Sequence, residues 1–203
     1  MNIKIKTLLI VIFFHSLCLS ANGFNANDHR IAVLVNDQLI TSYDVIQRMK
    51  LNAILAGIDI TPENNNQLLT SVVDELIKEK LKNQKINEFN ISVSEEEFLK
   101  QELFFYENNP IDKEELIKIF KMNGIKYSDF KNFLINDISW QKLISGMYYR
   151  LTSTSEVEIE EIISKNPNIS EEIAIDIIVQ RQLDLKSSKM IRDLFNEATI
   201  EYK

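Results

Sequence analysis

The stretch IAVLVNDQLITSYD, residues 31–44, decides the fold of this chain. Its first five residues are apolar and three of them are β-branched, which predicts a short strand; Gln38–Thr41 predicts a second one. The intervening Asn36-Asp37 is typical of a tight hairpin turn. Thr41 or Ser42 then caps a helix. A lone hairpin is marginal in water, so this one needs a third strand from elsewhere in the chain.

The residues before the hairpin have the pattern of an export signal. Lys4 and Lys6 form a basic start, residues 7–20 form an apolar run, and residues 21–23 offer small side chains for cleavage. We therefore predict a signal peptide over residues 1–23 and a mature chain over residues 24–203 that folds as one domain.

Two other interpretations of the same segment stay open. It could be an uncleaved membrane anchor, although the apolar run is shorter than the roughly 20 residues that span a bilayer. Cys18 could be a lipid-modified cysteine, although Leu17 rather than a small residue precedes it.

Behind the hairpin, apolar residues recur at intervals of three and four, which predicts helices. Gly57 is placed to end the first helix, and Thr61-Pro62 is a strong start for the second. Asp184 is predicted to begin a separate last helix after a break at Leu183. The remaining helices are expected over about residues 95–106, 113–123, 128–147, 157–163 and 170–183.

The last six residues, ATIEYK, have the alternation of a strand instead. Ala198, Ile200 and Tyr202 alternate with three polar residues. This is the only strand pattern outside the hairpin, so we predict that it becomes the third strand and brings the two ends of the mature chain together. The expected fold class is mainly α with a small β-hairpin joined by a C-terminal strand: residues 30–151 form the core, and residues 156–203 pack back on it.

Charge and cysteine content narrow the class of protein. Without the two lysines of the predicted signal, 21 basic and 30 acidic residues remain, a net charge of −9. An acidic chain without a basic patch is a poor candidate for binding nucleic acid or anionic lipid. Cys18 is the only cysteine, so the mature fold would rely on no disulfide.

No combination of residues predicts catalysis. Glu95-Glu96-Glu97 and the four glutamates of residues 156–161 could act as acids, bases or metal ligands. Acidic residues at helix starts are also favoured simply by the positive end of the helix dipole. His29 is the only histidine after residue 23. We expect no catalytic residue, no metal and no cofactor.

In two places three consecutive residues have large side chains, more than one buried stripe of a helix can hold. These are Phe104-Phe105-Tyr106 and Met147-Tyr148-Tyr149. They either line an apolar groove for extended client chains, for which Met and aromatic side chains are well suited, or lie on helices enclosed by the core. Trp140, with Leu143 and Ile144, is predicted to be core. Further candidates for the rim of a groove are Met49, Leu51, Leu55 and Met122.

The small sheet also has two interpretations. Its edge could capture a peptide by strand addition. Alternatively the sheet is a structural clasp, with the C-terminal strand already occupying one edge.

The hairpin and the two segments behind it resemble the SurA-type periplasmic chaperones. In the opening segment the matching residues are Ile31, Ala32, Val35, Asn36, Ile40, Thr41, Asp44 and Val45. In the next segment, residues 68–98, they are Asp74, Leu76, Ile77, Leu81, Gln84, Ile91, Val93, Ser94 and Glu97. Residues 122–144 are similar to a later loop and helix, with Lys131 and Asn136 in place of the usual arginines. Residues 182–203 resemble the closing helix and strand of that family.

The resemblance implies that the closing strand joins the opening hairpin, which agrees with the strand pattern. SurA proteins usually carry parvulin prolyl isomerase domains between these two parts. No such domain fits between Leu151 and Gln182, and the mature chain has only three glycines. The sequence therefore resembles a SurA chaperone core without the isomerase.

The resemblance implies a periplasmic chaperone that binds unfolded outer-membrane protein precursors without isomerase activity. It also implies transient contact with the outer-membrane assembly machinery, and cleavage of the signal would leave no stable membrane insertion. The alternative is an exported helical adaptor that docks one specific folded envelope protein.

Overall fold

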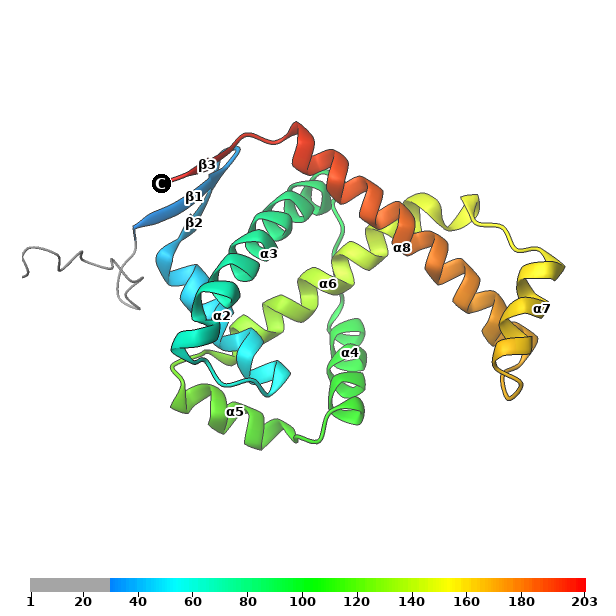
Figure 1. The fold of residues 1–203 in the computed structure, drawn as a ribbon, viewed down its shortest axis with the longest axis horizontal. Helices are drawn as coiled ribbons and strands as arrows, with labels where there is room; N and C mark the ends of the chain where they lie inside the picture. The colour runs from blue at the N-terminus through cyan, green and yellow to red at the C-terminus, as the bar shows by residue number, and fades with distance from the viewer. Residues whose placement is uncertain (1–29) are drawn as a thin grey trace, which may run out of the picture.

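The structure is a computed structural model that describes residues 30–203 (Figure 1). The predicted signal peptide lies outside the described residues. The elements are β1 (Ile31–Val35), β2 (Gln38–Thr41), α2 (Ser42–Ala56), α3 (Pro62–Glu88), α4 (Glu95–Asn108), α5 (Lys113–Met122), α6 (Tyr127–Tyr148), the 3-10 turn η1 (Tyr149–Leu151), α7 (Glu156–Lys165), α8 (Glu171–Glu197) and β3 (Ile200–Tyr202). The fold class is confirmed: mainly helical, with one three-stranded sheet in the order β2-β1-β3.

The hairpin turn depends on Asn36. Its backbone has φ 54°, a left-handed conformation that asparagine tolerates better than most residues. Its backbone N–H donates to the Thr199 carbonyl at 2.8 Å, and its side-chain oxygen accepts from the Thr199 N–H at 2.9 Å. Its amide group also donates to Gln84 of α3 at 2.9 Å. One turn residue thus joins the hairpin, the C-terminal segment and α3.

The C-terminal strand pairs with β1 as the sequence predicts. Val33 lies opposite Tyr202 and Val35 opposite Ile200, in antiparallel register. The backbone N–H of Lys203 also donates to the carbonyl of Ala32 at 3.0 Å. In Figure 1 the C-terminus accordingly lies beside the start of the first strand.

The sheet packs against α2 and α3. Alternate residues of β1 face them, and Val33 and Val35 are 1% and 0% exposed. They share a core with apolar residues of both helices, and Leu194, Ala198 and Ile200 pack against the same core from the C-terminal side. The end of the chain therefore completes the first core rather than lying outside it.

Two further cores follow along α6. Leu51 of α2 joins Phe98, Phe120 and Phe130 where α4, α5 and α6 meet. Near the other end of α6, Trp140 and Leu143 pack with Leu183 of α8. Trp140 is a core residue, as predicted, and its indole N–H donates to Ser187 of α8 at 2.8 Å.

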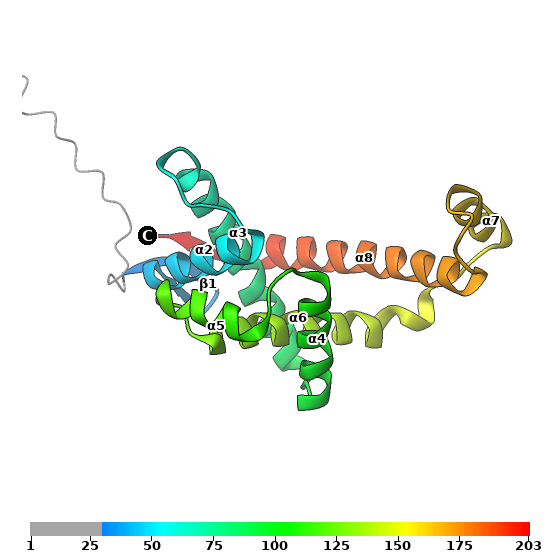
Figure 2. The ribbon, with the colours of Figure 1, turned by 90° about the horizontal axis from the view of Figure 1, so that it is seen from below.

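Beyond these cores, α7 and the first half of α8 extend away from the rest of the molecule (Figures 1 and 2). We call residues 156–182 the arm. It has a small core of its own, built on Ile162, Ala174 and Ile178. The linker to it is held by Gln182, whose side chain both donates to the Ser153 carbonyl at 2.6 Å and accepts from the Ser153 N–H at 3.1 Å.

The predicted break at Asp184 is wrong. α8 is one continuous helix of 27 residues, and Asp184 accepts a hydrogen bond from Gln180 at 2.8 Å on its surface. No glycine or proline lies in α8 to stop it, so an isolated aspartate has no helix end to cap. The predicted cap at Thr41 is confirmed, and Ser94, Asp112 and Ser155 are side-chain caps of α4, α5 and α7.

The clasp between β1 and β3 can be tested by Ile200→Asp. Replacing a partly buried apolar side chain of the first core by a carboxylate should lower the free energy of unfolding by about 2–3 kcal/mol, measured by urea denaturation. The matched control is Glu201→Gln, one residue along and exposed, with an expected change within about 0.5 kcal/mol. Equal stability of the two variants would contradict a structural role for β3.

Candidate functional site

α4 presents apolar side chains on more than one face. It begins at Ser94, whose hydroxyl accepts from the Glu97 N–H in a capping box. Phe98 and Glu102 point into the molecule, while Leu99, Leu103 and Phe104 are 50%, 59% and 58% exposed. We call these three side chains the α4 face. Leu99 and Leu103 lie one helical turn apart, and Phe104 lies about 100° further round the helix. A helix that packs on one neighbour needs only one apolar stripe, so these side chains are surplus to the fold.

The predicted run Phe104-Phe105-Tyr106 is divided between surface and core. Phe104 belongs to the α4 face. Phe105 lies edge-on to Phe130 of α6, with ring centroids 5.0 Å apart, and edge-on to Tyr106 at 5.4 Å. Phe104 is therefore the most exposed of the three rings, and Phe105 and Tyr106 are half-buried.

The second predicted run is divided in the same way. Met147 and Tyr148 pack against the core at the end of α6, whereas Tyr149 is 61% exposed. The two runs belong to different cores, so the structure does not join them into one groove.

Of the four rim candidates, two are corrected. Met49 and Leu51 are 7% and 2% exposed, because α2 is covered on one side by α3 and the sheet and on the other by α5 and α6. Leu55 packs against the second core. Met122 is 77% exposed at the end of α5.

The structure also exposes apolar residues that the sequence did not single out. Leu99 and Leu103 of α4 are two of them. Leu151, Val157, Ile173 and Ile177 are exposed on and beside the arm, and we call these four side chains the arm surface. The sequence signal that could have found them is the number of apolar residues in each helix. Where a helix has more apolar residues than one buried stripe holds, the additional ones face solvent.

A buried carboxylate joins α4, α5 and α6. Glu102 is 4% exposed and accepts from the hydroxyls of Tyr127 and Tyr106 and from the Lys113 ammonium, whose nitrogen lies 2.8 Å from its oxygen. Burial alone would raise the pKa of this carboxyl, but the hydrogen bonds and the Lys113 charge outweigh burial and hold its pKa below the usual range. Burial and the nearby carboxylate raise the pKa of both tyrosines. All these groups satisfy one another, so the cluster is structural.

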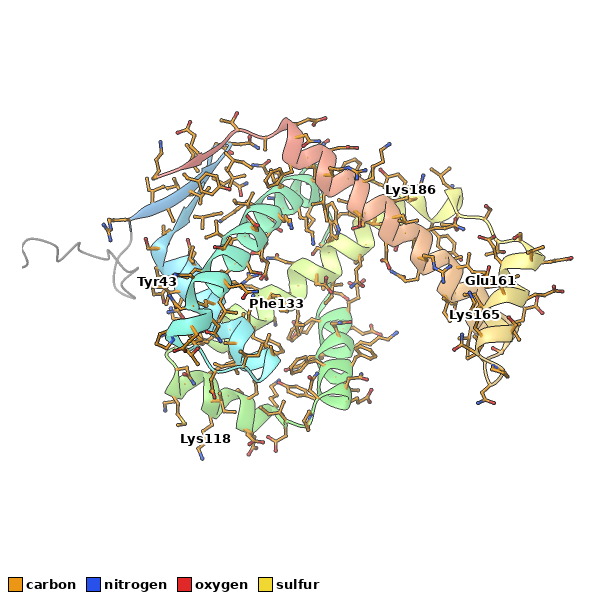
Figure 3. The ribbon with its side chains drawn as sticks, in the orientation of Figure 1. Tyr43, Lys118, Phe133, Glu161, Lys165 and Lys186 are labelled. Atoms are coloured by element: carbon orange, nitrogen blue, oxygen red, sulfur yellow. The ribbon has the colours of Figure 1, made fainter. Side chains whose placement is uncertain are left out.

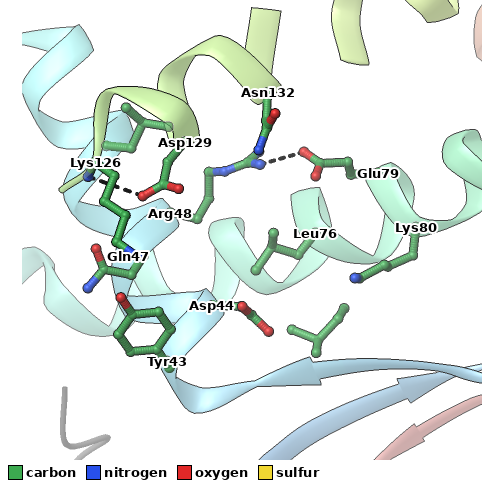
Figure 4. Close-up of a pocket in the computed structure, with 12 residues that line it drawn as sticks. Tyr43, Asp44, Gln47, Arg48, Leu76, Glu79, Lys80, Lys126, Asp129 and Asn132 are labelled. Atoms are coloured by element: carbon green, nitrogen blue, oxygen red, sulfur yellow. Dashed lines mark hydrogen bonds and ion pairs between the residues drawn. The ribbon is translucent and has the colours of Figure 1, made fainter. Parts of the chain in front are cut away.

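A cleft of about 250 Å³ lies between α2, α3 and α6 (Figure 4). Its charged groups are largely paired: Arg48 contacts Glu79 at 2.5 Å and Glu75 at 2.7 Å, and Asp129 accepts from the Lys126 backbone N–H. Among residues 30–203, Gln47 Oε1 is a buried side-chain oxygen without a hydrogen-bond partner. Charged and amide side chains line the cleft together with Ile40, Leu51 and Leu76, so it differs in character from the α4 face.

A model of the SurA-like N-terminal domain family matches residues 1–144 of the sequence. The chain belongs to this family. No curated protein matches the sequence. The SurA-like N-terminal domain, as matched, includes the α4 face and ends within α6, so the arm lies beyond it.

The fold is also similar to a solved structure. It comes from work on PEB4 and Cj1289, a virulence factor and a periplasmic protein described as structurally related SurA-like chaperones of Campylobacter jejuni. The sequences are 14% identical, the match covers 85% of this chain and 98% of that chain, and the TM-score is 0.50. At this identity the match supports the SurA-like fold and nothing finer.

Within residues 30–203 no helix of this SurA-like chain is long and apolar enough to cross a membrane. In the same part of the chain, no cluster of three or more His, Cys, Asp or Glu side chains is arranged to hold a metal ion. What remains as a candidate site is the exposed apolar surface.

The placement of the rim candidates can be tested by truncation. Leu51→Ala should lower the free energy of unfolding by about 2–5 kcal/mol, because it leaves a cavity in the second core. Met122→Ala, at an exposed position on α5, should change it by less than about 0.5 kcal/mol. Thermal and urea denaturation would measure both, and a stable Leu51→Ala variant would place Leu51 on the surface.

The Glu102 cluster is predicted to make a pH-dependent contribution to the free energy of unfolding. Glu102→Gln should lower the free energy of unfolding at pH 7 by about 1–3 kcal/mol. Because the folded pKa lies below the ordinary value of 4.5, the contribution is present above that value and lost as pH falls through the folded pKa. The difference between wild type and variant should therefore shrink in acid. Glu107→Gln, at an exposed position on the same helix, should show no such trend.

Proposed function

We propose that this protein is a periplasmic chaperone that holds unfolded outer-membrane protein precursors, with the α4 face as its main contact. The observation that carries the proposal is three apolar side chains of one helix, each at least half exposed, in a SurA-like N-terminal domain. Exposed apolar patches of this kind are typical of interaction sites. The arm surface and Tyr149 would supply further contacts.

The mechanism is mass action. An unfolded precursor that rests an apolar segment on the α4 face has less apolar surface free for association with other precursors. The client loses chain entropy when it binds, so each contact is weak and several must act together. Neither ATP nor a covalent step is required, and the chaperone acts without prolyl isomerase activity. Release to the outer-membrane assembly machinery would follow from the same weak contacts.

The acidic surface has a role in this proposal. Exposed Glu96, Lys100 and Glu107 of the same helix lie between Leu103 and Phe104 around the helix axis. Charges beside an apolar patch keep the chaperone itself soluble, because they oppose the association of two identical patches. The same net negative charge disfavours clients with acidic segments.

The test is suppression of aggregation. An unfolded porin diluted from urea should stay in solution when the chain from residue 24 onward is present, as followed by light scattering. The triple substitution L99S/L103S/F104S should reduce this protection at least about fivefold, since it removes the apolar contacts. Its matched control, E96S/K100S/E107S, changes three exposed residues of the same helix and should retain protection.

A second set of clients separates the proposal from its alternative. Several unrelated porin-type precursors should be protected, while a folded soluble protein should not bind. Protection of none of them would contradict the chaperone and favour an exported adaptor that docks one folded envelope protein. Protection that survives L99S/L103S/F104S would show that clients bind elsewhere.

A further inference from the structure

A shallow groove of about 310 Å³ runs along α8, apart from the α4 face and the arm surface. Tyr148, Met190 and Leu194 contribute apolar side chains to it, and Lys85 of α3 lies at its border. The other lining residues are four exposed charged side chains of α8: Lys186, Lys189, Asp193 and Glu197. We call these four the charged stripe.

The charged stripe lies on one side of the helix and is divided by sign. Its members are three or four residues apart, the spacing that places side chains on one helix face. Both lysines come first and both acids follow. Figure 3 shows Lys186 on the outer margin of α8, away from α4 and α5. No other element of the described chain covers this margin in either ribbon view.

Part of this arrangement is electrostatically unfavourable in a single chain. Lys186 and Lys189 are like charges at i,i+3, and Asp193 and Glu197 are like charges at i,i+4, which destabilises a helix. Lys189 and Asp193 are opposite charges at i,i+4, the one favourable spacing within the stripe. Glu197 also lies at the C-terminal end of α8, where the helix dipole disfavours an anion. Within residues 30–203 none of the four makes an ion pair, although Lys186 lies 6.0 Å from the centre of the Tyr148 ring.

We propose that the charged stripe is a self-association surface on which α8 of a second copy of this chain packs antiparallel. About a twofold axis near residue 191, Lys186 faces Glu197 of the second copy and Lys189 faces Asp193. Each copy therefore supplies two cations against two anions, giving four intermolecular pairs by symmetry. Met190 and Leu194 line the same groove on the side of α8 that packs against the chain's own core.

The charge pattern selects this occupant over others. A parallel α8 would place lysine against lysine and acid against acid, which is repulsive. A uniformly acidic or basic partner would satisfy only half of the stripe. α8 is about 40 Å long at 1.5 Å per residue, so only part of it is used. The contact is accordingly small and exposed, which predicts a weak, salt-sensitive dimer.

The experiment is sedimentation equilibrium of the chain from residue 24 onward, from about 1 µM to about 1 mM. The wild type should shift from monomer to dimer within this range, and raising salt from about 50 mM to about 500 mM should weaken the dimer at least about threefold. K186E/K189E makes the stripe wholly acidic and D193K/E197K makes it wholly basic, so each variant alone should be monomeric.

Combining these variants gives the decisive measurements. A mixture of K186E/K189E with D193K/E197K should form a heterodimer at least as tight as the wild-type dimer, because the four facing pairs are again opposite in sign. The fourfold variant K186E/K189E/D193K/E197K reverses the stripe and should regain self-association. R181E/R192E makes the same change in net charge at exposed positions on another side of α8 and should dimerise like the wild type.

These results can overturn the proposal independently of chaperone activity. A wild type that stays monomeric at about 1 mM, or a mixture of the two opposite variants that does not associate, rules out the surface. A dimer that R181E/R192E abolishes as fully as K186E/K189E would show an effect of net charge alone. All four substituted positions are exposed, and far-UV circular dichroism would verify that every variant is folded.

Discussion

The pairing of the first strand with the last is the constraint on which the rest of the structure depends. β1 has hydrogen-bonding groups on both edges, and β2 satisfies only one of them. The segment that satisfies the other comes from the end of the chain, with Asn36 joining the two through Thr199. Ile200 and Leu194 also cover the first core. The same C-terminal segment therefore completes both the strand pairing and the hydrophobic core.

This closure determines where α8 runs. Only Ala198 and Thr199 separate α8 from β3, so the end of the helix is held near the hairpin. Its C-terminal half then packs on α3 and α6, with Leu183 and Trp140 in contact in the third core. A helix of 27 residues is longer than the surface that it crosses, and its first half projects with α7 as the arm. The arm is a consequence of this length.

The candidate site shows the limit of reading helix patterns. Consecutive bulky residues correctly indicate that a helix cannot bury all of them, but periodicity alone does not say which ones face outward. Phe130 of α6 is what brings Phe105 into the core and leaves Phe104 outside. Met49 and Leu51 look like any other apolar residues of an amphipathic helix; they are buried because α2 is covered on two sides.

The sequence by itself determined the hairpin, the C-terminal strand and nearly all helix starts, because turn residues, capping side chains and apolar spacing act over a few neighbouring positions. It also indicated the SurA-like family through residues of the hairpin and α3. Only the tertiary structure decided that α8 continues through Asp184, which rings are buried and which apolar surface stays open. Those features depend on contacts between residues far apart in the chain, and no local pattern records them.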